Sequence, residues 1–203
     1  MNFTGRTRAG FAALAVVAVV AFGAPVSPLM AQTSGTVLGV SGFGGFTTDP
    51  GGFDVFRDTK FDAAYHFGAA LSFRMSPNVV ARVDVSKAYS TGEETTALAG
   101  EVVDFNRTYF GVAVEARFPV SGVTPYLLAG GGMVTLDRTA PSRNYKFSEV
   151  AGRLGGGLAV PLSDSSVEFF VEGSKWFYGR VSTGEGTQFD TSVSAGLTFV
   201  PDL

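Results

Sequence analysis

Apolar and polar residues alternate along FDAAYHFGAALSF, residues 61–73. This alternation predicts a β-strand with two different faces, because successive side chains of a strand point to opposite sides. One face carries the aromatic and aliphatic residues from Phe61 to Phe73, and the other runs from Asp62 to Arg74 through small residues. The same period of two recurs in further segments, at residues 79–86, 108–118, 149–160, 167–178 and 191–199.

Two other segments, residues 36–46 and 125–136, are apolar or glycine on both faces. Their spacing and composition predict strands, but the pattern does not define their register. Lys175 interrupts the alternation of its own segment, which predicts either a β-bulge or a position at a membrane interface. The segment 32–203 contains no amphipathic helix of normal length, so the pattern predicts an all-β chain of eight strands.

The connections between these strands alternate in length. Long polar stretches follow the first, third, fifth and seventh strands, at residues 47–60, 90–104, 138–146 and 182–188. Short ones follow the second, fourth and sixth, at residues 76–78, 119–122 and 163–166. Short turns at one end and long loops at the other are typical of a bacterial outer-membrane barrel. The sequence therefore predicts an eight-stranded antiparallel up-and-down transmembrane β-barrel.

The two faces distinguish a membrane barrel from a soluble one, in which the apolar face would be inside. The polar face is rich in Gly, Ala and Ser, which suit a narrow lumen. Its charges have both signs: Arg74, Arg82, Arg117 and Arg153 against Asp84, Glu115, Glu149, Glu168 and Glu172. Aromatic residues near the predicted strand ends of the apolar face are typical of interfacial girdles: Phe61, Phe73, Phe110, Phe118, Phe177 and Phe199.

An arginine on the lipid side costs roughly 2–4 kcal/mol at mid-depth, so the polar face is expected to point inward. Unpaired buried charges are strongly penalised, which predicts pairing across the lumen. The predicted structural network of lumen residues is Arg82, Asp84, Glu115, Arg117, Glu149, Arg153, Glu168, Glu172 and His66.

The N-terminus carries an export signal. Arg6 and Arg8 precede a short apolar run, and small residues follow it. This order predicts a signal peptide over residues 1–31, with cleavage after Ala31 or, alternatively, after Ala24. The run is short for a membrane helix, which disfavours an uncleaved anchor. Residues 32–203 are then the barrel domain.

Composition excludes several classes. Charged residues make up only 16% of the chain and hydrophobic residues 45%, with 27 Gly and 19 Phe, which is unusual for a soluble domain. The net charge of -3 argues against nucleic acid as a partner, since phosphate binding needs a basic surface. The absence of cysteine excludes disulfides and thiolate metal sites.

Three segments carry a family resemblance: TPYLLAGGGM (124–133), VEFFVEGSKWFY (167–178) and SVSAGLTF (192–199). With the signal peptide, they resemble the small eight-stranded outer-membrane barrels, the OmpA-like and opacity-protein-like group, over the whole mature chain. The resemblance implies a monomer in the bacterial outer membrane, with outer-membrane lipid and the barrel-assembly machinery as partners. Such barrels usually end on an aromatic residue. Phe199, four residues from the end here, is expected to take that part.

Candidate chemistry is sparse. His66 is the only histidine, and Gly68 stands where lipid-editing members of the family would have a serine, so a structural role is favoured. Glu168 and Glu172 are four strand residues apart, about 13 Å, which is too far for a glycosidase pair. The glycine runs do not fit a nucleotide motif. The acidic residues of the first long loop, Asp49, Asp54, Asp58 and Asp62, allow a weak calcium site, although a solvated loop is favoured. We predict no catalytic residue, cofactor or metal.

Three functions follow from this sequence, in order of preference. The first is a structural outer-membrane protein whose outer loops are available for surface contact, the segment 92–102 among them. The second is a narrow channel or carrier for small hydrophobic molecules, with Tyr109, Phe170 and Trp176 in the lumen. The third is a lipid-modifying enzyme that depends on His66.

Overall fold

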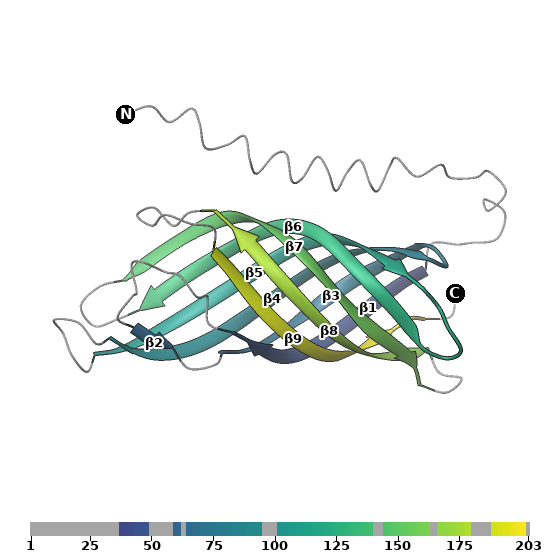
Figure 1. Ribbon diagram of the computed structural model, residues 1–203, viewed down its shortest axis with the longest axis horizontal. Coiled ribbons are helices and arrows are strands. Elements are labelled where there is room, and N and C mark those ends of the chain that lie inside the picture. Colours follow the sequence, from purple (N-terminus) through teal and green to yellow (C-terminus); the bar gives the residue numbers. More distant parts are fainter. Residues whose placement is uncertain are drawn as a thin grey trace, which may run out of the picture.

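The computed structural model describes residues 37–48, 59–61, 64–94, 101–139, 144–162, 166–179 and 188–201, and the predicted signal peptide lies outside them. These residues form antiparallel strands that wind round a tilted barrel (Figure 1). The strands are β1 Val37–Thr47, β2 Thr59–Phe61, β3 Ala64–Ser76, β4 Val79–Glu94, β5 Glu101–Arg117, β6 Thr124–Thr139, β7 Tyr145–Pro161, β8 Val167–Tyr178 and β9 Gln188–Phe199.

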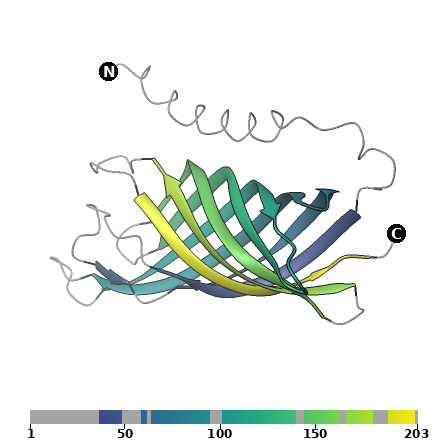
Figure 2. The ribbon, with the colours of Figure 1, turned by 45° about the vertical axis from the view of Figure 1, so that its right-hand side comes forward.

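The sheet closes on itself. β1 pairs with both β3 and β9, and β4 pairs with both β3 and β5, so the row of strands has no free edge along its length. The short β2 pairs with β4 just beyond the part of β4 that β3 covers, so β2 and β3 occupy one strand position. The predicted eight-stranded barrel is confirmed. Figure 2 shows that the strands of the barrel wall are steeply tilted relative to the barrel axis.

The predicted faces are confirmed as well. On β3, Tyr65 and Phe67 are exposed on the outside, whereas His66 and Ala70 are buried. Burial also defines the register that the sequence left open on two strands. Residues that point inward there include Ser41, Phe43, Tyr126 and Leu128, and those that point outward include Val40, Phe46, Leu127 and Met133.

The loops at the long end are shorter than predicted, because backbone pairing continues into polar sequence. β4 and β5 pair as far as Glu94 and Glu101, well inside the predicted loop 90–104. β9 starts at Gln188 and therefore includes Asp190. At the other end the turns are tight, as predicted. The β5–β6 turn contains Ser121 and Gly122 with φ of 39° and 84°, a left-handed pair typical of two-residue hairpin turns.

One prediction about a single residue was wrong. Phe110 lies in the middle of β5 rather than near an end, because the strand begins at Glu101. Of the two alternatives predicted for Lys175, the bulge is excluded, because β8 keeps an unbroken register with β7 and β9 on either side of it. The irregularity lies instead between β3 and β4, where the register shifts between Arg74 and Ser76.

Glycines on the lumen side make room for large aromatic rings. A Cβ atom added to Gly196 would lie 2.7 Å from Phe170 Cζ and 2.7 Å from Phe43 Cβ. One added to Gly157 would lie 2.6 Å from the Tyr126 hydroxyl. These rings could not share the narrow interior with ordinary side chains, so the glycines on one strand set the positions of aromatics on others.

We expect Gly196→Ala to lower the free energy of unfolding by about 1–3 kcal/mol, since the added methyl group overpacks the lumen. Gly173→Ala is the matched control, because Gly173 lies on β8 with open space where the added Cβ would stand. Urea titration of the refolded protein in vesicles, followed by the fluorescence of the single Trp176, measures both variants. Equal midpoints for the two variants would contradict the packing argument.

Candidate functional site

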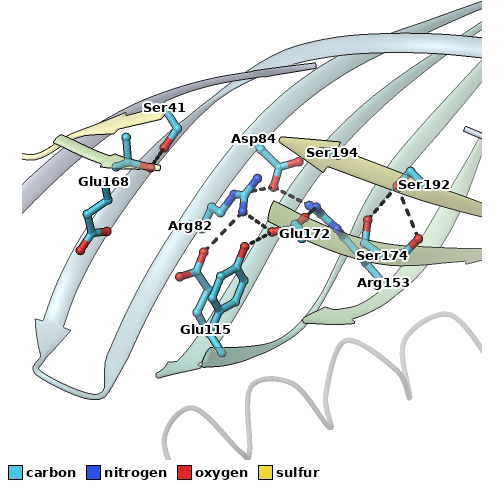
Figure 3. Close-up of polar contacts among 12 residues, drawn as sticks. Ser41, Arg82, Asp84, Glu115, Arg153, Glu168, Glu172, Ser174, Ser192 and Ser194 are labelled. Carbon is cyan, nitrogen blue, oxygen red and sulfur yellow. Dashed lines mark hydrogen bonds and ion pairs between the residues drawn. The ribbon is translucent and has the colours of Figure 1, made fainter. Parts of the chain in front are cut away.

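The centre of the lumen holds a cluster of five charged side chains, the central cluster: Arg82, Asp84, Glu115, Arg153 and Glu172 (Figure 3). Arg82 Nη1 donates to Glu172 Oε2 at 2.7 Å and to Glu115 Oε1 at 3.4 Å. Arg153 donates to Glu172 Oε1 at 2.5 Å and to Asp84 Oδ2 at 2.7 Å. All five side chains are at least nine-tenths buried, so each carboxylate meets a guanidinium instead of water.

The cluster crosses the barrel from wall to wall. Arg82 and Asp84 lie on β4, and Glu172 lies on β8, which is separated from β4 by three strand positions in either direction round the barrel. Small residues beside the charges leave the necessary space. Arg82 is paired in register with Ser72 and Ala113, and Asp84 with Ala70 and Gly111. Long charged side chains can therefore extend across the lumen.

Aromatic rings pack against the guanidinium groups of Arg82 and Arg153 in cation–π contacts. The Arg82 guanidinium lies 5.5 Å from the Phe43 ring centroid and 5.8 Å from that of Phe170. The Arg153 guanidinium lies 5.1 Å from the Trp176 ring. The faces of aromatic rings attract cations, and the effect is larger away from water. The Phe170 and Trp176 positions proposed for a hydrophobic carrier are thus occupied in packing against arginines.

Towards the short turns, the network continues to the mouth of the barrel. Arg117 Nη2 donates to Glu168 Oε2 at 2.9 Å, and Arg117 Nε lies 3.4 Å from Glu115 Oε2. Arg74 Nη2 donates to the other Glu168 oxygen at 3.3 Å, and its side chain is 35% exposed. A small cavity that opens to solvent lies here beside Arg82.

Towards the long loops, a second cluster surrounds Asp190, which is fully buried. Arg107 Nη1 donates to Asp190 Oδ1 at 2.8 Å. The hydroxyls of Tyr109 and Tyr178 donate to Oδ2 at 2.5 Å and 3.0 Å. Sequence reasoning missed Arg107 and Asp190, because the predicted strands began one residue later in both cases. The alternation itself extends back to them, since Arg107 precedes Tyr109, and Asp190 precedes Ser192, by two residues.

His66 lies between the two clusters and forms hydrogen bonds to hydroxyls. Its Nε2 is 3.0 Å from Ser194 Oγ and its Nδ1 is 3.0 Å from Thr47 Oγ1. A second, small cavity lies beside it. A histidine that activates a serine is usually oriented by a carboxylate on its other nitrogen, and here that place is taken by Thr47. The Ser194 neighbour lies on β9 and is remote in sequence, so it gave no local signal.

The nine predicted lumen residues thus divide into three sets. Seven are joined in one chain of ion pairs: Arg82, Asp84, Glu115, Arg117, Arg153, Glu168 and Glu172. His66 joins the hydroxyl group instead. Glu149 lies on the lumen side of β7, four residues or about 13 Å along the strand from Arg153, nearer the long loops.

The described residues offer little for other chemistry. They contain no group of three or more His, Asp or Glu side chains placed to hold a metal ion. They also contain no helix long and apolar enough to cross a membrane. The acidic residues of the first long loop, Asp49, Asp54, Asp58 and Asp62, lie outside the described residues. Of the segment that contains them, only β2 is described.

No family model and no curated protein matches the chain in sequence. Solved structures are similar in fold. Neisserial surface protein A is 14% identical, with a TM-score of 0.56 over 82% of this chain and 97% of that one. A major outer membrane protein from Thermus thermophilus is 12% identical, with a TM-score of 0.48 over 81% and 99%. The outer membrane enzyme PagL is 14% identical, with a TM-score of 0.44 over 81% and 99%. The likeness to Neisserial surface protein A shows that the chain has the fold of the small eight-stranded outer-membrane barrels.

We expect Glu172→Gln to lower the free energy of unfolding by about 3–5 kcal/mol, because Arg82 and Arg153 both lose a buried partner. Asp137→Asn is the control: Asp137 pairs with Lys146 at 3.9 Å in an exposed position, where a pair contributes about 0–1 kcal/mol. Unfolding in urea measures both variants. A Glu172→Gln protein as stable as the control would show that the central cluster contributes no stability.

Proposed function

We propose that this protein is a structural, non-enzymatic barrel of the bacterial outer membrane, exported by its N-terminal signal peptide and closed along its axis by ion pairs. The observation that carries the proposal is the path from Arg82 through Glu172 to Arg153 across the lumen. A pore needs a continuous polar passage, whereas here the polar groups are occupied with one another.

The outer surface supports the membrane location. Large apolar side chains remain exposed on every long strand, for example Leu71, Val112, Leu154 and Leu197. Such a continuous apolar surface would aggregate in water, while lipid solvates it. Around it, a closed barrel leaves no unpaired backbone edge, which the bilayer interior requires. Phe73, Phe118 and Phe199 are exposed at the short-turn end, where an aromatic girdle is expected.

The two cavities support a closed state. The turn-side cavity is lined by Arg82, Glu115 and Phe170, and the loop-side cavity by Phe43, Asp84 and Arg153. The central cluster and its aromatic neighbours thus separate them. Neither side offers a continuous apolar tunnel, which weakens the carrier hypothesis. His66 with two hydroxyl partners and no carboxylate weakens the enzyme hypothesis.

Contacts at the cell surface are assigned to the long connections, at residues 49–58, 95–100, 140–143 and 180–187. A deletion in the second of these should be confined to residues 95–100, since residues 92–94 and 101–102 pair within strands. We propose that the barrel-assembly machinery recognises Phe199 during insertion. Phe199 is the last residue of β9 and is exposed on the outer surface. The protein is expected to act as a monomer, with outer-membrane lipid as its surroundings.

The first test is electrophoresis of outer-membrane fractions without and with boiling. We expect a heat-dependent mobility shift, because a folded membrane barrel resists detergent until it is boiled. Planar-bilayer recording of the same protein should then give no sustained conductance. A soluble periplasmic protein without a shift would contradict the membrane location, and a steady open channel would contradict the closed lumen in favour of the channel hypothesis.

A further inference from the structure

Two lysines stand out on the outer surface of the barrel. Lys87 on β4 follows the exposed Val85, and Lys175 on β8 follows Val171 and Gly173, so both come directly after apolar outward positions. Among the residues whose side chains the structure describes, no carboxylate forms a salt bridge with either ammonium group. Lys146, in contrast, is paired with Asp137 and its side chain is 70% exposed.

The two lysines lie at the same level on opposite sides of the barrel. Each is the ninth residue of a strand that starts at the short-turn end, at Val79 or at Val167. Eight residues cover about 26 Å along a strand, which a tilt near 40° reduces to about 20 Å of depth. An outer-membrane barrel has an apolar band about 25 Å tall. Both lysines therefore lie just inside the loop-side border of that band, where a flexible stem carries the ammonium group to the headgroups.

Each ammonium lies among aromatic rings and beside a threonine. Lys175 Nζ is 3.7 Å from the Phe189 ring centroid and 5.6 Å from that of Phe177. Its register neighbour on β9 is Thr191. Lys87 Nζ is 4.8 Å from the Tyr89 ring, and its neighbour on β5 is Thr108. The rings fix the direction of the lysine stems, and the hydroxyl groups add donors at the same level.

We propose that Lys87 and Lys175 each bind the phosphate of an anionic lipid headgroup in the leaflet that surrounds the long loops, giving two separate sites on opposite walls. The aromatic rings leave the charge of each ammonium without a counter-ion, and at the border of an apolar band the membrane itself can supply that anion. Phosphate accepts charge-assisted hydrogen bonds from an ammonium and from a nearby hydroxyl together. This inference rests on the proposed outer-membrane location.

Native mass spectrometry of the full mature chain, refolded in detergent, tests the proposal with bis-phosphorylated lipid A as the probe. We expect the wild type to retain up to two lipid molecules. Lys87→Gln and Lys175→Gln should each weaken retention by about fivefold, and the double variant should retain neither molecule. Lys146→Gln, a lysine paired with Asp137, should behave as the wild type. Arginine at positions 87 and 175 should restore retention.

Three results would overturn the proposal: unchanged retention by the double variant, equal loss in Lys146→Gln, or equal retention of fully dephosphorylated lipid A. Excess inorganic phosphate should not displace the lipid, and full displacement would show a free-anion site instead. The boiling shift, measured on the same samples, distinguishes failure of the lipid site from failure of the proposed membrane location. A variant that keeps the shift but loses lipid supports the site, whereas a wild type without the shift contradicts the membrane location itself.

Discussion

The closure of the sheet governs the rest of this structure. In the proposed membrane location, a backbone surrounded by hydrocarbon must find every hydrogen-bond partner within the protein, so the eight strand positions have to form a ring. A ring of that size encloses a narrow interior, which side chains fill. The narrow interior in turn requires that any charge in it meets an opposite charge. The pairing of Arg82 and Arg153 with Glu172 is a result of these three steps.

The lumen combines two kinds of packing that depend on each other. Glycines such as Gly157 and Gly196 leave space for rings, and the rings of Phe43 and Phe170 flank the Arg82 guanidinium. Arg82 of the central cluster therefore packs against aromatic rings, and these rings fit only because glycines on other strands carry no side chain. A change at one glycine can in this way alter an ion pair on another strand.

Much of this could be predicted from the sequence, because a period of two directly reports which side chains share a face. The strands, their faces and the inward charges followed from it. The partners did not follow, since residues such as His66 and Ser194 meet only through closure of the ring. Strand ends were also underestimated: backbone pairing continued through polar residues at Ser90–Glu94, where side-chain pattern carries no signal. The strands that carry Arg107 and Asp190 also begin earlier than predicted, so these two buried residues were missed.

The seam between β1 and β9 has a consequence for folding kinetics. It joins Val40–Thr47 to Ser192–Phe199, the two ends of the barrel sequence, whereas the other long strands pair with neighbours in the chain. Contacts so distant in sequence form slowly, because a long loop must close before they contribute. The ring can therefore be completed only after the last strand has been delivered. Until then both β1 and the growing end of the sheet present open edges, which makes arrival of the C-terminal strand the step that commits the chain to its barrel.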